Sequence, residues 1–422
     1  MNAALPRRRD RSRRFDIVLW GATGFTGRLV AEYLVEHYGD TDLRLALGGR
    51  NLAKLEGVRA ELARLCPPAA DLPLLIGDSF DVPSLRAIAS QTEVVCTTVG
   101  PYGKYGAGLV EACVEEGTDY CDLTGETPFI RRMIDSHHDR AVQTGARIVH
   151  CCGFDSIPSD LGTWMMFRAM EEQGAELGEV AFYAGESHGG FSGGTVASIL
   201  HLLEEARRDP GVRAVLSDPY ALNPEGERSG PDGPDPMTVH FDRRLRMWVG
   251  PFLMAAINSR VVRRTNALLG YPYGRSFRYS ERMSFGKGPK GLLRATAVAT
   301  GLAAFVAAAS IGPTRRLLAQ KVLPKPGEGP SREERERGFF VVRLIASGRT
   351  GDGQAVELRG RVEGRKDPGY GETAKMLAEA ALCLALDGAE LDAPGGVRTP
   401  ASTMGDRLLE RLRAASMLFE VR

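Results

Sequence analysis

Short apolar segments alternate with longer helical segments over the first third of the chain. The apolar segments cover residues 15–20, 43–47, 72–76, 94–99, 120–123 and 147–151. Each of them is too continuous in its apolar residues for a strand with one face in water, as is typical of strands that helices cover on both faces. The pattern therefore predicts an α/β fold with a doubly wound parallel sheet over residues 15–152.

The pattern changes after residue 152. The segments expected there are a helix from about residue 158, a strand near 180–184, a helix opened by Ser192-Gly193-Gly194-Thr195, a surface loop over 223–237, strands at 339–347 and 355–363, and helices near 372–386 and 403–414. The two later strands flank a Gly-rich turn and predict an antiparallel hairpin. We expect a second α+β domain with a mixed or antiparallel sheet over residues 153–422. Whether its C-terminal helices pack back on the first domain stays open.

Residues 295–312 carry no charge and contain many alanines, at about the minimum length for a membrane span. Alanine is only weakly lipophilic and Gly301 interrupts the segment, so we predict a buried or interface helix. A membrane-surface contact stays open. Arg315, Arg316 and Lys321 would suit such a contact, although basic residues after a helix also suit its dipole.

Composition narrows the classes of partner. A chain of 422 residues is long enough for two domains that share a cleft. Its net charge of +1 gives no field that would recruit nucleic acid. Seven cysteines without paired spacing indicate reduced thiols in the cytoplasm. The basic residues within 1–14 predict a solvated, disordered tail, and no apolar signal core follows them.

A glycine-rich turn follows the first predicted strand and opens the next helix. It reads Gly21-Ala22-Thr23-Gly24-Phe25-Thr26-Gly27. Glycines in such a turn let backbone amides approach a pyrophosphate, and the helix N-terminus adds positive potential. The sequence thus predicts that the first domain is a Rossmann domain, with Gly21, Thr23, Gly24, Phe25, Thr26 and Gly27 at the dinucleotide.

The end of the second predicted strand decides between the two nicotinamide cofactors. It carries no acid for a ribose 2′-hydroxyl, and Arg50 with Asn51 and Lys54 stands there instead. An arginine suits a 2′-phosphate, so we expect NADP(H) rather than NAD(H), with a plain surface arginine as the alternative. After the third strand, Asp78 either receives the adenine amino group or caps the next helix.

The fourth predicted strand leads into a Gly-Pro turn. Thr98, Val99, Gly100 and Pro101 are expected to border the nicotinamide ribose, because open α/β sheets bind ligands at the carboxyl ends of their strands. Reduction of a polarised double bond also needs a proton. Tyr102, Lys104 and Tyr105 follow the turn as candidate proton donors, with aromatic packing as the alternative for either tyrosine.

Later strands end in acidic segments. Residues 120–126 and 152–160 place several acids where substrate should meet cofactor. Asp155 is a further catalytic candidate, although Asp155 or Ser156 could instead cap the helix that starts near Pro158. His137 and His138 are adjacent in a helix and point to different faces, so no metal site is expected.

Together these motifs resemble the saccharopine dehydrogenase-like oxidoreductases, and among them most closely the trans-acting enoyl reductases. The segments that carry the resemblance are 21–27, 48–50, 99–102, 122–126, 152–160, 367–376 and 397–401. The resemblance implies a Rossmann domain, a second domain with a mixed sheet, and NADP(H). It also implies reduction of an enoyl thioester on an acyl carrier protein, beside a polyketide synthase that makes complex lipids.

Three functions stay open at this point. The first is an NADPH-dependent enoyl reductase, which the apolar segment 295–312 favours because a lipid-like chain needs an apolar wall. The second is a saccharopine-type amino-acid dehydrogenase, which would need cleft arginines drawn from Arg260, Arg263, Arg264, Arg275 and Arg278. The third is a non-catalytic dinucleotide-binding adaptor at a membrane. We expect a cytoplasmic protein and leave open a homodimer and a peripheral position at the inner face of the membrane.

Overall fold

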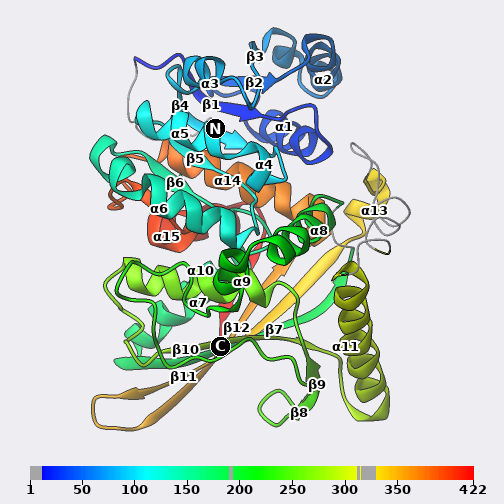
Figure 1. Cartoon of the computed structure of the whole chain (residues 1–422), viewed down its shortest axis with the longest axis vertical. Helices are drawn as coiled ribbons and strands as arrows, with labels where there is room; N and C mark the ends of the chain where they lie inside the picture. Colours follow the sequence, from blue (N-terminus) through cyan, green and yellow to red (C-terminus); the bar gives the residue numbers. More distant parts are fainter. Residues whose placement is uncertain (1–11, 190–192, 311–313, 315–328) are drawn as a thin grey trace.

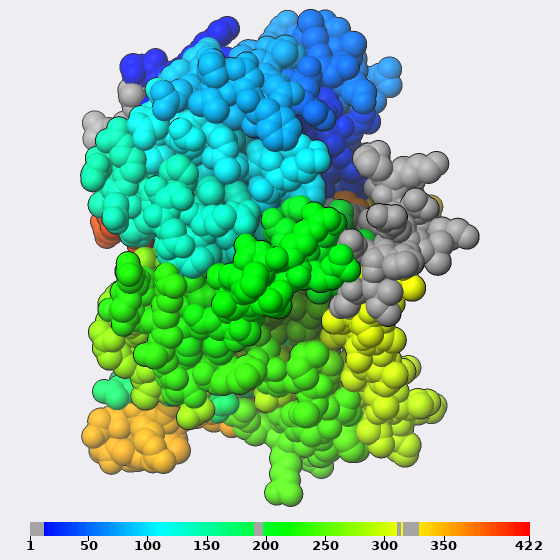
Figure 2. Space-filling view, in the orientation of Figure 1, coloured from blue at the N-terminus to red at the C-terminus, as the bar shows by residue number. Residues whose placement is uncertain are grey.

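The computed structural model describes residues 12–189, 193–310, 314 and 329–422. Two seven-stranded sheets organise this part of the chain. The N-terminal residues build the domain around the first sheet, and most of the later residues build the domain around the second, so that the two stack end to end (Figures 1 and 2). This arrangement confirms the predicted fold class.

The first sheet is parallel throughout, with strand order β13-β6-β5-β4-β1-β2-β3. Its strands are β1 (Phe15–Trp20), β2 (Leu45–Gly49), β3 (Leu74–Ile76), β4 (Thr92–Thr97), β5 (Asp119–Cys121), β6 (Arg147–Val149) and β13 (Gly396–Arg398). Every residue of β1 is buried, as its largely apolar sequence predicts. The six strands predicted in this part of the chain are all present, with ends shifted by a few residues.

Helices cover both faces of this sheet. One face carries α1 (Phe25–Tyr38), α2 (Leu52–Leu65) and α14 (Thr373–Leu386), and the other carries α3 (Val82–Ala89), α5 (Ala107–Glu115) and α6 (Thr127–Thr144). All residues of α14 are buried, and this helix contacts β1, β4 and β5. Near its end the chain therefore returns to the first sheet with α14 and β13. A domain boundary at residue 152 stays a prediction.

The second sheet has strand order β14-β12-β11-β7-β10-β9-β8. Its strands are β7 (Ala175–His188), β8 (His240–Asp242), β9 (Met247–Gly250), β10 (Arg278–Ser284), β11 (Phe339–Thr350), β12 (Ala355–Gly364) and β14 (Leu418–Val421). Only the β7–β10 pair is parallel among these described strands, so the sheet is mixed. The pair β11–β12 is the predicted hairpin. Helix α7 (Ile157–Glu172) packs on this sheet, and α10 (Ala255–Leu268) packs on β10 and α7.

The remaining helices lie around these layers. They are α4 (Tyr102–Tyr105), α8 (Gly193–Arg208), α9 (Pro210–Ser217), α11 (Gly288–Ser310), α13 (Arg332–Glu336), α15 (Pro400–Ala414), the short 3-10 helix Pro67–Asp71 and the short π-helix Pro368–Glu372. The expected helix opened by Ser192-Gly193-Gly194-Thr195 corresponds to α8, and Ser192 itself lies outside the described residues.

Two sequence predictions differ from the structure. The apolar segment 295–312 falls largely in α11, but only 11% of the apolar stretch of that helix is buried, because one side alone packs on β9 and α8. Burial within the chain was therefore wrong, and an interface helix stays a prediction. The disordered tail was predicted to reach residue 14, yet Arg13 donates hydrogen bonds to the backbone oxygens of Ala89, Thr92 and Glu116. Residues 1–11 lie outside the described part of the chain, as do Arg315, Arg316 and Lys321.

Candidate functional site

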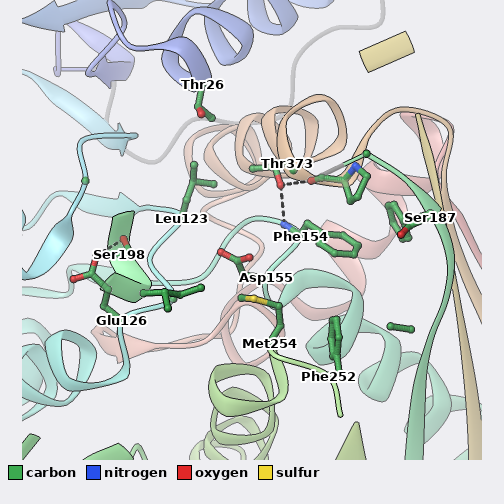
Figure 3. A pocket seen from close by; sticks show the side chains of 18 of the residues that line it. Thr26, Leu123, Glu126, Phe154, Asp155, Ser187, Ser198, Phe252, Met254 and Thr373 are labelled. Carbon is green, nitrogen blue, oxygen red and sulfur yellow. Dashed lines mark hydrogen bonds between the residues drawn. The ribbon is translucent and has the colours of Figure 1, made fainter. Parts of the chain in front are cut away.

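A cavity of about 550 Å³ lies between the carboxyl end of the first sheet and the second sheet. Thr26 and Leu123 reach it from the first domain, while Met283 and Phe340 belong to the second sheet. Figure 3 shows Asp155 in the middle of this wall, between Leu123 above and Met254 below. Because both domains supply its wall, a ligand there would contact residues far apart in the sequence.

The glycine turn is closed so tightly that only glycine fits at two positions. Gly21 has a φ of +93°, and a Cβ atom there would lie 2.6 Å from Val99 Cγ2. A Cβ atom on Gly27 would lie 2.2 Å from the Gly21 carbonyl oxygen. Gly24 precedes α1, and no side chain caps this helix. The first amides of α1 are therefore open to an anion, as pyrophosphate binding requires.

The other predicted residues of this turn have different surroundings. Thr26 lines the cavity, and Thr23 lies half-buried in the turn. The Phe25 ring packs edge-on against Tyr370, with 4.8 Å between the ring centres. Phe25 thus anchors the turn to the segment 368–372.

The end of β2 presents two cations to solvent. Arg50 and Lys54 are exposed, and neither side chain forms a hydrogen bond or ion pair with any described residue. The Asn51 side chain accepts a hydrogen bond from the Lys54 backbone amide at 3.0 Å and caps α2. Arg50 and Lys54 are therefore available to an anionic group, whereas Asn51 has a structural partner.

Asp78 does not cap the helix that follows it. Its Oδ1 accepts a hydrogen bond from the Phe80 amide at 2.9 Å, and α3 begins later, with Asp81 at the N-cap position. The capping alternative for Asp78 was wrong, since its side chain closes a local turn instead.

The Gly-Pro turn is joined to the glycine turn. The Thr98 amide donates to the Trp20 carbonyl oxygen at 3.1 Å, and the Thr98 hydroxyl donates to the Gly21 oxygen at 3.3 Å. Thr98, Gly100 and Pro101 line the cavity, and Val99 packs against Gly21. The structure thus brings the two predicted cofactor-binding segments together.

The three candidate donors of α4 differ in position. The buried Tyr102 hydroxyl donates to the Thr97 oxygen and accepts from the Leu123 amide, both at 3.2 Å. Burial raises the pKa of Tyr102 well above its usual value. Lys104 is exposed with Nζ 5.0 Å from the centre of the Tyr105 ring, and neither residue lines the cavity.

Asp155 lines the cavity and has no hydrogen-bond partner among the described residues. Burial raises the pKa of its carboxyl from 3.8 to about 7, because the charged form is poorly solvated there. Ser156 occupies the N-cap position of α7, where no side chain caps the helix, and its hydroxyl donates to Asn258 Oδ1 at 3.0 Å. The capping alternative for Asp155 and Ser156 was therefore wrong. The Asp155 carboxyl can hold a proton at neutral pH and present it to a ligand.

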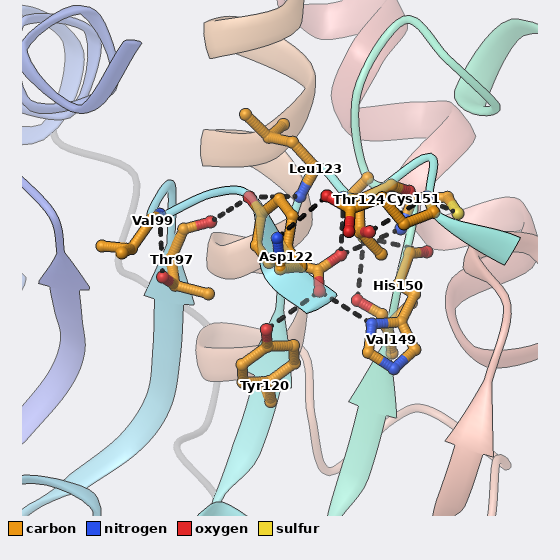
Figure 4. A network of polar contacts seen from close by, with 12 residues as sticks. Thr97, Val99, Tyr120, Asp122, Leu123, Thr124, Val149, His150 and Cys151 are labelled. Carbon is orange, nitrogen blue, oxygen red and sulfur yellow. Dashed lines mark hydrogen bonds and ion pairs between the residues drawn. The ribbon is translucent and has the colours of Figure 1, made fainter. Parts of the chain in front are cut away.

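The sequence placed Asp122 and Glu126 together at the substrate face, but the structure separates them. Figure 4 shows Asp122 as the centre of a polar network, where its carboxylate accepts from the Tyr120 hydroxyl at 2.9 Å and pairs with His150 Nδ1 at 2.7 Å. It also accepts from the backbone amides of Thr124 and Cys151. Asp122 is fully buried and ties the end of β5 to the segment that follows β6, so it is structural.

Glu126 does line the cavity, as expected for the acids of residues 120–126, although nothing in the sequence distinguishes it from Asp122. Its Oε1 accepts from the Tyr102 amide at 2.9 Å and from the Ser198 hydroxyl at 2.8 Å, and its Oε2 accepts from the Gly103 amide at 2.8 Å. Glu126 lies several residues after the end of β5, which is a weak signal, and nothing in the sequence links it to Ser198. Glu126 holds the turn beside the cofactor-binding segments.

The candidate arginines lie outside the cavity. On α10, Arg260 pairs with Asp235, Arg263 pairs with Asp232 at 2.9 Å, and Arg264 donates to two backbone oxygens. Arg275 and Arg278 are exposed and do not line the cavity. Among all the described lining residues there is no lysine, arginine or histidine. A substrate with several carboxylates would find no cation there.

The described residues hold no group of three or more His, Cys, Asp or Glu side chains that could bind a metal. All seven cysteines are buried and form no disulfide. The cavity therefore offers acid and backbone groups, and within the described residues no metal cluster.

Comparison with known proteins identifies the family of this chain. The model of the saccharopine dehydrogenase NADP binding domain matches residues 17–149. A protein of Mycobacterium tuberculosis, to which trans-acting enoyl reductase activity is ascribed, is 45% identical over 414 residues, covering 96% of this chain and 97% of the relative. A trans-acting enoyl reductase of Mycobacterium bovis is 42% identical over 416 residues, with coverage of 96% and 97%. The solved structure of apo saccharopine dehydrogenase (L-Glu forming) from Saccharomyces cerevisiae aligns over 96% of this chain and 99% of its own, with a TM-score of 0.52 at 13% identity. That last likeness concerns the fold.

Proposed function

We propose that this chain, which belongs to the trans-acting enoyl reductases of the saccharopine dehydrogenase-like family, reduces the α,β-double bond of an acyl thioester with NADPH. The observation that carries the proposal is Asp155, an unpartnered carboxyl with a pKa of about 7 in an apolar cavity beside the nucleotide turn. Such a group can supply the proton that completes the reduction.

The residues around the glycine turn fit an NADP cofactor. The uncapped start of α1 and the close-packed Gly21 and Gly27 leave room for the pyrophosphate. Arg50 and Lys54 would hold the 2′-phosphate, because both are exposed and unpaired within the described residues. We infer from these two cations a preference for NADPH over NADH, and we assign Asp78 to the adenine side of the site.

The chemistry divides between cofactor and protein. When bound, NADPH supplies the hydride that adds to the β-carbon of the substrate. The electron pair of the double bond then moves toward the thioester oxygen, and Asp155 gives its proton to the α-carbon. The carboxylate left behind regains a proton from solvent. Thr98, Gly100 and Pro101 line the cavity and would border the reacting end of the cofactor.

Tyr102 has a positioning role in this scheme. Its hydroxyl proton is held by the Thr97 oxygen, and its amide is held by Glu126. It therefore fixes the turn and the Leu123 amide rather than giving up a proton. Lys104 and Tyr105 do not line the cavity, so we assign them no catalytic step.

The cavity wall fits an acyl chain. Leu123, Phe154, Phe252, Met254 and Met283 line it. Apolar walls favour a hydrocarbon chain, whereas an amino-acid substrate with several carboxylates would need cations that the described wall lacks. This contrast favours the enoyl thioester over a saccharopine-type substrate.

The names of the relatives suggest a protein partner that delivers the substrate. The relatives are named trans-acting, and we propose that a carrier protein of a polyketide synthase presents the thioester to this chain during complex lipid synthesis. We place the enzyme in the cytoplasm, where its seven buried cysteines stay reduced.

Substrate class can be tested with purified protein. NADPH consumption is followed with a medium-chain trans-2-enoyl pantetheine thioester and, separately, with glutamate plus an α-amino-aldehyde that together form an imine. We expect turnover of the thioester alone. Turnover of the imine mixture alone would establish the amino-acid activity, and NADPH binding without turnover of either would favour the non-catalytic adaptor.

A further inference from the structure

Helix α11 (Gly288–Ser310) is the one helix in the described part of the chain that combines great length with an apolar sequence. It is long and apolar enough to cross a membrane by length and composition, a weak criterion that soluble core helices also meet. In α11, however, most residues are exposed. Leu293 has 71% of its surface exposed, and Ala297, Thr300 and Ala304 follow it at helical spacing on the same outer side.

The inner side of α11 is attached to the protein. The Gly291 position faces Trp248 of β9, and the Ala295 carbonyl oxygen faces Gly250. Helix α11 also contacts α8. In Figure 1 it runs along one side of the molecule, next to β9. Because these contacts hold one side of the helix, α11 cannot cross a bilayer without leaving the body of the protein.

The outer side differs from an ordinary surface helix. Helices that face water carry charged residues on their outer side, but residues 295–310 have none. An exposed apolar stripe of this kind marks an interaction surface. Whatever binds to this stripe must therefore contact apolar side chains along most of the length of the helix.

Charge identifies the occupant. Lys287, Lys290 and Arg294 are exposed at the start of α11 and have no ion-pair partner among the described residues. No Asp or Glu occurs between residues 288 and 310. A second copy of α11 would offer these cations no acid, whereas the headgroups of an anionic bilayer would pair with them while the acyl region takes the apolar stripe.

The position of Val298 connects this surface to the cavity. Val298 is 39% exposed on α11 and also lines the cavity wall. The wall of the cavity thus reaches the surface of α11 at Val298.

We propose that α11 lies in the plane of an anionic phospholipid surface, with its outer side in the headgroup and upper acyl region, and so places the cavity entrance at the membrane. The proposal of a membrane contact depends only on the observations made on α11. The further step, that acyl substrate enters past Val298, rests on the proposed function.

The test is co-sedimentation of the full chain with phosphatidylcholine vesicles that contain either no phosphatidylglycerol or about one third of it. We expect binding to the anionic vesicles and at least tenfold weaker binding to the neutral ones. The variant Leu293→Glu/Ala304→Glu should lose at least tenfold in vesicle affinity. The control Val142→Glu/Met237→Glu adds the same charge at exposed positions elsewhere and should bind like the parent.

Each outcome decides between occupants. Failure of the parent chain to bind either kind of vesicle, or equal losses in both double variants, overturns the proposal. A dimer in sedimentation velocity that only Leu293→Glu/Ala304→Glu dissociates, without vesicle binding by the parent, would assign α11 to a second copy. NADPH-dependent reduction of a water-soluble enoyl thioester without vesicles reports on the proposed function separately, and matching melting temperatures show that both variants fold.

Discussion

The Glu126 carboxylate accepts a hydrogen bond from the Ser198 hydroxyl at 2.8 Å, and the same carboxylate holds the amides of Tyr102 and Gly103. One buried acid therefore joins α8 to the turn beside the cofactor-binding segments. Ser198→Ala removes a single hydrogen bond and should cost about 1 kcal/mol of unfolding free energy. Glu126→Ala leaves the buried Tyr102 amide and the half-buried Gly103 amide unpaired, and should cost about 1–3 kcal/mol for the Tyr102 amide alone. Urea unfolding measures both, and equal losses would show that Glu126 does not hold the turn.

Gly27 is expected to tolerate no side chain. A Cβ atom there would lie 2.2 Å from the Gly21 carbonyl oxygen, so Gly27→Ala should weaken NADPH binding by roughly a hundredfold or more, about 2.7 kcal/mol. The matched control is Gly57→Ala on α2, where an added Cβ meets nothing within 4 Å. Fluorescence titration with NADPH should find the control unchanged. Normal binding by Gly27→Ala would remove the turn from the cofactor site.

Arg50 should discriminate between the two cofactors. Because its guanidinium is exposed and unpaired within the described residues, Arg50→Ala should raise the Kd for NADPH about tenfold, or 1.4 kcal/mol, and leave the Kd for NADH unchanged. Arg64→Ala, an exposed arginine near the other end of α2, serves as the control. Equal weakening of both cofactors would mean that Arg50 does not bind the 2′-phosphate.

The activity should fall as the Asp155 carboxyl loses its proton. Its pKa of about 7 predicts that kcat is level at lower pH and falls about tenfold per pH unit above that value. Asp155→Asn should lower kcat by roughly a hundredfold and abolish this break. Asp392→Asn changes an exposed acid and should leave the profile as it is. A break near 7 that persists in Asp155→Asn would assign the proton to another group.

Stability gives an independent check on the same group. The pKa of Asp155 is raised in the folded state, so the folded chain holds more protons than the unfolded chain between the ordinary value of 3.8 and about 7. Stability from this group is full below the unfolded pKa and is lost as pH rises through the folded pKa. Thermal melts should therefore find Asp155→Asn more stable than the parent at about pH 8, with the difference gone at about pH 4.

The arginines of and near α10 should separate stability from substrate binding. Arg264 is buried, and burial lowers the pKa of its guanidinium to about 9. Arg264→Ala removes donors to Leu222 and Val397 and should lower unfolding free energy by about 3 kcal/mol. Arg275→Ala/Arg278→Ala changes exposed residues and should leave kcat/KM within twofold. Loss of activity in that double variant would favour a saccharopine-type amino-acid substrate over the enoyl thioester.

The sequence was informative where local chemistry determines the structure. The apolar segments predicted the strands of the Rossmann sheet, since burial on both faces leaves a continuous signal. β13 was missed because it spans three residues, Gly396–Arg398, and pairs with β6, which lies far from it in the sequence. The exposure of α11 was also missed, because composition reports apolarity and not the neighbours that cover it.

The candidate site was predictable in part for the same reason. Glycine spacing identified the turn at Gly21 and Gly27 because the constraint is local. The sequence around Asp122 does not distinguish it from Asp155. In the structure Asp122 is hydrogen-bonded within a buried network, whereas Asp155 has no partner among the described residues. That difference depends on which residues, distant in the sequence, contact each carboxyl group in the folded chain.

The buried position of α14 bears on how the chain folds during synthesis. The first sheet is translated early, but the helix that fills part of one of its faces lies at Thr373–Leu386. Until that segment leaves the ribosome, apolar surface of β1, β4 and β5 has no permanent cover, and contacts over such separations form slowly. The nascent N-terminal domain is thus a natural client for chaperones, and a chain that stops before Thr373 would expose the surface on which aggregation starts.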